Sequence, residues 1–152
     1  MSLVQGRAAS AIRRLWQQEK DEVAQVAARV SLVASGVTNV SAALVGGRAR
    51  GLLEVLEHEV LPYLDWEEVI VHPVLDRLDG GSRASRALHA QLEQVRAAIG
   101  LVQADWAGLR EAPTPRQLID LRTHLRRLGV IMAAHLEQEE RALAPVLAVA
   151  AA

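Results

Sequence analysis

Apolar residues recur every three or four positions along most of the chain, a spacing that predicts amphipathic helices. We expect four of them, at 8–35, from about 39–41 to 78, from 82 to the segment 112–115, and from 115 to about 143. Short turns join these helices. The predicted fold class is therefore all-α, an antiparallel up-and-down four-helix bundle.

The same spacing predicts which side chains face the core. In the second helix the inward stripe is expected to contain Leu56, Val60, Tyr63, Glu67, Ile70 and Val74. In the fourth it contains Leu118, Leu121, Leu125, Leu128 and Met132, and continues to His135 and Glu139. The third stripe begins at Leu88 and Leu92, with His89 on its flank, and the first is interrupted by Glu19 or Lys20. Polar side chains are therefore expected on or beside the core faces.

Turn and cap residues support the helix boundaries. Asp79, Gly80 and Gly81 predict a turn, after which Ser82 is a suitable N-cap. Thr114 followed by Pro115 is a good helix start. Pro62 is expected to bend the second helix just before Tyr63, and Pro145 follows the last predicted turn of the fourth.

The inward polar residues form two related motifs. His135 and Glu139 are one helical turn apart, as are Tyr63 and Glu67, and each motif leads through a second glutamate to a proline, Pro145 or Pro73. A buried carboxylate is costly unless it is paired or bound to a cation. Two inward carboxylates on two helices therefore predict a shared metal site, with a core hydrogen bond between His135 and Glu139 as the alternative.

The composition of the chain excludes several kinds of partner and site. The 152 residues are expected to form a single domain, 1–152. A net charge of -1 gives no electrostatic case for nucleic acid as a partner. The chain has no cysteine, which excludes disulfides and thiolate ligands. Residues 30–47 are uncharged but contain several polar residues and glycines, so we expect no membrane span, and a cytoplasmic location is the default.

With these residues placed, the chain resembles hemerythrin-like proteins of the HHE cation-binding class. That family has a His in the first helix, His-x-x-x-Glu in the second, a His in the third and a second His-x-x-x-Glu in the fourth. His135 with Glu139 matches the fourth helix, and His89 matches the third. Glu67 matches the second, although Tyr63 stands where the family has His. In the first helix Lys20 stands at the His position.

The resemblance implies a metal site that is partly rebuilt. His89 and His135 would serve one metal, reached by Glu67 and Glu139. A second metal would lose its imidazoles to Lys20 and Tyr63, which are the only lysine and the only tyrosine of the chain. The implied cofactor is iron, as one or two ions, with manganese or zinc also suited to these ligands.

Several functions remain open for such a site. The metal would bind or react with O2, peroxide or NO, as a carrier, a sensor or an oxidoreductase. Tyr63 is either a phenolate ligand, a hydrogen-bond or radical partner, or a half-buried aromatic, and a further alternative is that Tyr63 and Lys20 act together in chemistry beside one metal. Lys20 is either a neutral ligand, a flank residue or a charge that replaces a metal beside Glu67 and Glu139. In the last case the bundle is metal-free and serves a structural or partner-binding role.

Two further features complete the predictions. His72 follows Glu68 by four residues and is expected to pair with it at the surface. The consecutive residues Val69, Ile70 and Val71 cannot all face one core, so the surplus suggests contact with a second copy in a homodimer.

Overall fold

The computed structural model describes the backbone of residues 3–37, 42–78, 81–109 and 113–151, and the side chains of 6–37, 47–78, 81–109 and 113–149. All the elements are helical: α1 (Leu3–Gly36), α2 (Ala42–Val55), η1 (Leu56–Val60), α3 (Leu61–Trp66), η2 (Glu67–Val71), α4 (His72–Leu75), α5 (Gly81–Gly108) and α6 (Pro115–Ala151). The segments η1 and η2 are single π-helical turns. They join α2, α3 and α4 into one continuous rod, called the α2–α4 rod below.

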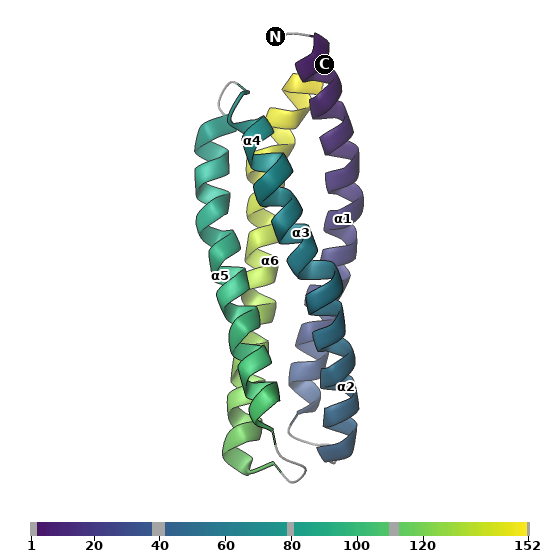
Figure 1. Cartoon of the computed structure of the whole chain (residues 1–152), viewed down its shortest axis with the longest axis vertical. Helices are drawn as coiled ribbons and strands as arrows, with labels where there is room; N and C mark the ends of the chain where they lie inside the picture. The colour runs from purple at the N-terminus through teal and green to yellow at the C-terminus, as the bar shows by residue number, and fades with distance from the viewer. Residues whose placement is uncertain (1–2, 38–41, 79–80, 110–112, 152) are drawn as a thin grey trace.

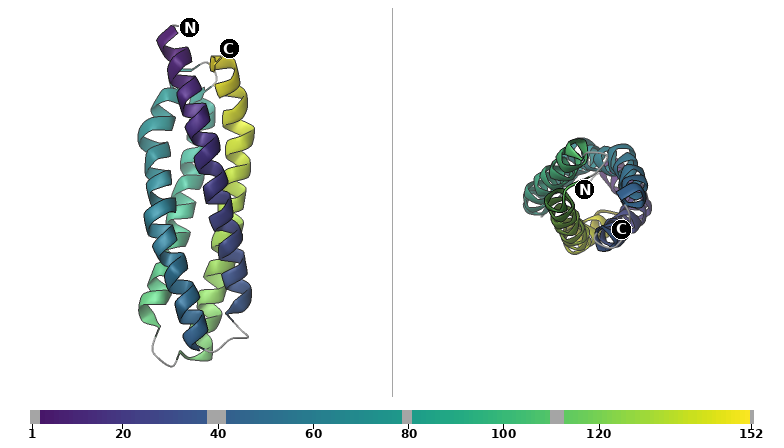
Figure 2. Two further views of the ribbon diagram at one scale, coloured as in Figure 1. Left: turned by 90° about the vertical axis from the view of Figure 1, so that its right-hand side faces the viewer. Right: turned by 90° about the horizontal axis from the view of Figure 1, so that it is seen from below.

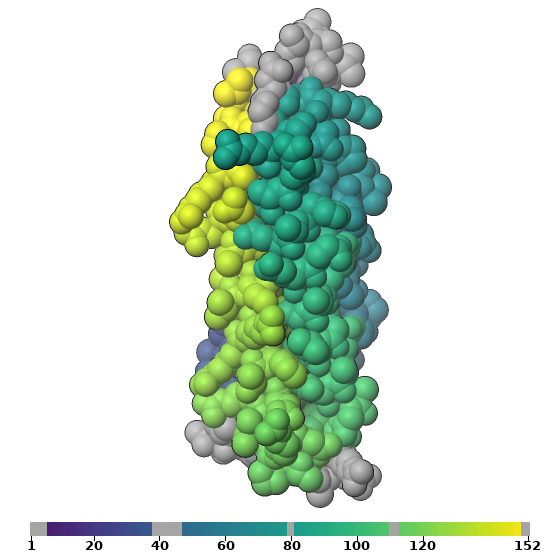
Figure 3. Space-filling view, turned by 90° about the vertical axis from the view of Figure 1, so that its left-hand side faces the viewer, coloured from purple at the N-terminus to yellow at the C-terminus, as the bar shows by residue number. Residues whose placement is uncertain are grey.

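Four rods run side by side and alternate in direction (Figure 1). The N- and C-termini lie at the same end of the molecule, and the end-on view shows the four rods around a common axis (Figure 2). α6 packs against both α1 and α5, and α5 and α6 lie next to each other along the face in Figure 3. These views confirm the predicted all-α, up-and-down four-helix bundle.

Several of the predicted helix ends were wrong, and α1 begins at Leu3 instead of residue 8. α6 continues to Ala151, through Pro145. This proline removes one backbone donor, but Leu143 and Leu147 on either side of it are fully buried, so their packing keeps the last turns helical. α5 begins at Gly81, so Ser82 lies within the helix and its hydroxyl donates a hydrogen bond to the Asp76 carbonyl (3.3 Å). The expected turn residues 79–80 and helix start 39–41 lie outside the described residues.

The start of α6 follows its sequence signal closely. The Thr114 hydroxyl accepts a hydrogen bond from the Gln117 backbone N–H (3.2 Å), and the Gln117 side chain accepts one from the Thr114 N–H (2.9 Å). This reciprocal pair is a capping box, which satisfies two backbone donors that a helix start leaves free.

Each π turn ends next to a proline. The Leu61 N–H donates to the Leu56 carbonyl and the His72 N–H to the Glu67 carbonyl, both five residues back, and Pro62 and Pro73 follow directly. A proline ring clashes with the carbonyl four residues before it in a regular α-helix. A wider turn at this point moves that carbonyl aside while keeping the rod continuous.

The second π turn changes which residues face the core. Ile70 was expected inside but is 45% exposed, while Val71 is 0% exposed. The same shift places Leu75 inside in place of Val74. Because a π turn holds more residues than an α turn, every position after Glu67 is rotated by about one residue relative to the prediction.

The apolar core consists of two clusters. The main cluster includes Val23 of α1, Leu64 of the α2–α4 rod, Leu92 of α5 and Met132 of α6. The terminal cluster, near the chain ends, includes Trp16, Val71, Leu88 and Leu143 from the same four rods. Between the clusters lies one layer of buried polar side chains: Glu67, His135 and Glu139.

No helix in the described ranges combines the length and apolar character that crossing a bilayer requires.

The register shift can be tested by a matched pair of truncations. Val71→Ala should lower the free energy of unfolding by roughly 1–3 kcal/mol, because it leaves a cavity in the core. Ile70→Ala should change it by less than about 1 kcal/mol, since Ile70 is largely in solvent. Urea unfolding followed by circular dichroism measures both. An equal or larger loss in Ile70→Ala would mean that the regular helical register continues past Glu67.

Candidate metal centre

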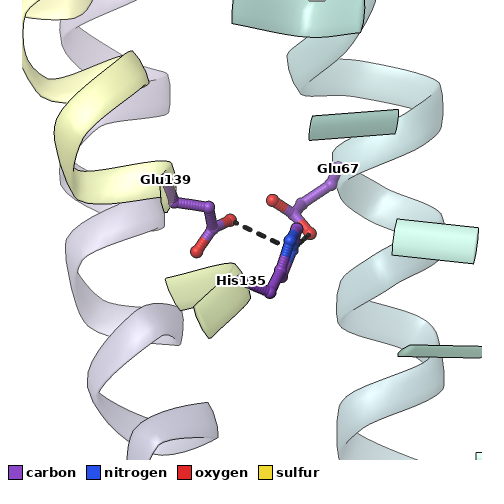
Figure 4. Close-up of side chains that lie close together, drawn as sticks. All are labelled: Glu67, His135 and Glu139. Atoms are coloured by element: carbon purple, nitrogen blue, oxygen red, sulfur yellow. Dashed lines mark hydrogen bonds and ion pairs between the residues drawn. The ribbon is translucent and has the colours of Figure 1, made fainter. Parts of the chain in front are cut away.

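Three ionisable side chains meet in the polar layer between the two clusters. α6 contributes His135 and Glu139 from successive turns, and Glu67 begins the π turn η2 (Figure 4). All three are buried. Each residue offers one possible ligand atom, an imidazole nitrogen or a carboxylate oxygen. These three atoms all lie within 4.8 Å of one another, which is close enough to hold a single cation.

The imidazole lies between the two carboxylates. His135 Nε2 is 3.1 Å from Glu67 Oε2 and 3.8 Å from Glu139 Oε1. The Tyr63 hydroxyl, one turn before Glu67 on the same rod, donates a 2.7 Å hydrogen bond to Glu139 Oε1. Two rods therefore hold the carboxylates toward each other, and Tyr63 fixes the orientation of Glu139.

The layer leaves acceptor atoms unused. Among the described side chains, Glu67 Oε1 and Glu139 Oε2 are buried without a hydrogen-bond partner, and so is His135 Nδ1. A buried polar atom without a partner costs free energy, and native proteins leave few of them. A cation between the carboxylates would supply the missing partner of the two oxygens. The donor set, one imidazole and two carboxylates, suits iron, manganese or zinc.

Burial holds protons on both carboxyl groups, and for Glu139 the neighbouring Glu67 adds to this effect. Burial raises the pKa of Glu67 to about 7. Burial and the neighbouring Glu67 raise the pKa of Glu139 well above its usual range. Burial lowers the pKa of His135, so its imidazole is neutral and able to bind a metal. Cation binding would therefore release protons from this layer.

Tyr63 is a neutral phenol in this setting. Burial, together with the charges of Glu139 and Glu67, raises its pKa well above the usual value. Of the roles considered for Tyr63, the geometry displays that of a hydrogen-bond donor to Glu139.

His89 lies away from the layer. Its side chain is 53% exposed on α5, with Nδ1 3.8 Å from Glu68 Oε1. The inward positions of α5 at this level are Leu88 and Leu92, which are fully buried, so the adjacent His89 is turned out of the core. His89, Glu68 and Glu93 also come close enough to share a cation, but Arg96 already forms ion pairs with both glutamates.

Lys20 also lies away from the layer. Its ammonium forms an ion pair with Glu140 and lies 5.0 Å from the centroid of the Trp16 ring. The inward positions of α1 are Trp16 and Val23, so Lys20 is half-buried on the flank of the helix. The positive charge of Lys20 is therefore paired with Glu140 and does not lie between Glu67 and Glu139.

His72 was expected at the surface but is buried, and its Nε2 has no hydrogen-bond partner among the described residues. Burial and the nearby His89 lower its pKa. The reason is the π turn, which turns His72 inward beside Val71. Pro73 was the signal in the sequence that could have indicated this change of register.

A four-helix bundle with buried carboxylates and an imidazole between facing helices belongs to the class of metal-binding carboxylate bundles. The chain matches the family model of the hemerythrin HHE cation binding domain over residues 10–147. It therefore belongs to this family. Searches of curated proteins and of solved structures give no significant match.

The raised carboxyl pKa values predict how stability depends on pH in metal-free protein. A carboxyl group whose pKa rises on folding stabilises the folded state below its unfolded pKa, and this contribution is lost as pH rises through the folded value. For Glu67 the window runs from 4.5 to about 7. Between pH 5 and 8, wild type should lose on the order of 3 kcal/mol more unfolding free energy than Glu67→Gln, whose amide does not titrate.

Chemical denaturation in the presence of a chelator measures this difference. His135 has the opposite sign, because its lowered pKa adds stability as pH rises to 6.5, but it is present in both proteins and cancels in the comparison. Glu54→Gln, at an exposed position, serves as the control and should follow wild type. Parallel pH profiles for wild type and Glu67→Gln would contradict the prediction.

Proposed function

We propose that the protein binds one metal cation, preferentially iron, between Glu67, His135 and Glu139. The observation that carries this proposal is the pair of buried carboxylates with unpartnered oxygens facing a neutral imidazole. Membership in a cation-binding family supports it independently. Manganese and zinc are the alternatives that the same ligands allow.

The placement of the other candidate ligands favours one ion over two. His89 faces solvent and Glu68, and Lys20 is paired with Glu140. Tyr63 donates a hydrogen bond to Glu139 and so supports a ligand without being one. This placement also weakens the alternative in which Lys20 replaces a metal, because its ammonium lies with a different acid.

Three protein ligands leave coordination positions open on the bound ion. Iron with such open positions binds or activates O2, peroxide or NO, and we propose ligands of this class. Around the site, Leu88 and Leu92 are fully buried and limit access of water. The Tyr63 hydroxyl oxygen lies 2.7 Å from Glu139 Oε1, and its proton can be shared with a ligand group.

A homodimer remains part of this proposal. Val69 and Ile70, on the outer side of η2, are 67% and 45% exposed, so they are the surplus apolar residues that contact with a second copy would cover.

Metal content tests the site directly. After anaerobic loading with ferrous iron and removal of excess metal, elemental analysis should give about one equivalent per chain. His135→Ala and Glu139→Ala should each lower this at least about tenfold, since loss even of outer partners of metal ligands costs that much. His89→Ala is the matched control and should keep the metal. Equal metal content in all four proteins, or none in wild type, would overturn the proposal.

Tyr63→Phe separates a supporting role from a ligand role. The phenol that donates to Glu139 is lost while the ring is kept, so the free energy of unfolding should fall by about 1–3 kcal/mol. At saturating ferrous iron the metal content should stay at the wild-type value, although the affinity falls by about tenfold because Glu139 loses a hydrogen-bond partner. If iron is absent even at saturation while the fold persists, Tyr63 is instead a ligand.

A further inference from the structure

A pocket of about 360 Å³ opens between α1 and the segment η1–α3. These two rods lie next to each other in the ribbon views (Figures 1 and 2). The pocket lies outside the trio Glu67, His135 and Glu139, yet Tyr63 lines it and reaches that trio through its hydroxyl. Its volume is at the lower end of the range for sites that bind small molecules.

The polar lining of the pocket is strongly acidic. Glu19 and Glu22 come from α1 and Glu59 from η1, so carboxylates lie on both walls. Of the described residues that line the pocket, none is a lysine or an arginine, and His58 is the only one that can become positive. The nearby Lys20 is paired with Glu140. Carboxylates grouped around a concave surface attract cations and repel anions.

The remaining lining is aromatic and aliphatic. The rings of Tyr63 and Trp66 lie 6.0 Å apart at an angle of 36°, and Leu15 belongs to the opposite wall. Aromatic faces attract organic cations and also pack against apolar carbon. A hydrated inorganic ion would use only the carboxylates and leave this apolar surface uncovered.

We propose that this pocket binds a small organic ammonium ion. The charged group lies among Glu19, Glu22 and Glu59, and the apolar body lies against Trp66 and Tyr63. Binding needs no metal, because the three metal ligands lie outside the pocket. Tyr63, which lines the pocket and hydrogen-bonds to Glu139, places the ligand one side chain away from the proposed metal.

The proposal is tested by calorimetric titration with three probes of similar shape and different charge. Phenethylammonium should bind with a dissociation constant on the order of 1 mM or lower, as its size allows. The neutral 2-phenylethanol and the anion phenylacetate should bind at least about tenfold more weakly, and added salt should weaken only the binding of the cation. Equal affinity for the alcohol, or no binding of the ammonium ion, would overturn the proposal.

Two double variants locate the site. Glu22→Gln/Glu59→Gln removes one carboxylate from each wall and should lower the affinity for phenethylammonium about fivefold or more. Asp21→Asn/Glu54→Gln makes the same change in net charge at exposed positions on the same two rods, outside the pocket, and should bind as wild type does. An equal loss in both would show attraction to overall charge, and not to this pocket.

The titration is repeated with His135→Ala in the presence of a chelator. This variant should bind the ammonium ion as tightly as wild type, because it changes no residue of the pocket. Wild-type protein that takes up no iron after loading but binds phenethylammonium would refute the metal site alone. Wild-type protein that holds iron but does not bind the ammonium ion would refute the pocket alone.

Discussion

The structure depends on the burial of two carboxyl groups, Glu67 and Glu139, in a bundle whose buried side chains are otherwise mostly apolar. Removing such groups from water costs several kcal/mol for each ion. The chain reduces this cost by three means: the Tyr63 hydroxyl donates to Glu139, the His135 imidazole lies between the acids, and raised pKa values keep protons bound. Two acceptor oxygens nevertheless find no partner among the described side chains. A purely structural core would be more stable with apolar residues here, so the layer is best explained by a function.

The layer also organises the packing around it. It divides the core into a main and a terminal cluster, and each of the four rods contributes to both. Glu67 is the first residue of a π turn, a feature that is frequent at functional sites. The wide turn lets the rod pass Pro73 without a break and returns Val71 and Leu75 to the core beyond the layer. The π turn thus allows Glu67 to point inward and brings apolar side chains back to the core one turn later.

Tyr63 connects the two sites proposed for this protein. Its ring lines the acidic pocket and its hydroxyl contacts Glu139, so one rigid side chain separates the proposed organic ligand from the proposed metal ligands. The π turns η1 and η2 lie on either side of the short helix that carries it. A change in the position of this ring therefore alters the hydrogen bond to Glu139. This contact provides a physical route by which occupancy of the pocket can influence the metal site.

The sequence by itself determined the class of fold, because the spacing of apolar residues and the turn signals are local properties of the chain. It also determined that Glu67, His135 and Glu139 point inward, since each continues an apolar stripe at helical spacing. Only the tertiary structure decided the rest. A prediction that assumes regular α-helical spacing cannot detect a π turn, so Ile70, Val71 and His72 were assigned to the wrong faces of the helix. The apolar stripes of α1 and α5 are those expected, but spacing alone cannot show whether a residue on the flank of a stripe reaches a site in the core. Packing of the rods places His89 beside Glu68 and Lys20 beside Glu140, away from the polar layer. The pocket beside Tyr63 likewise depends on how α1 and α3 lie against each other, which neither segment encodes alone.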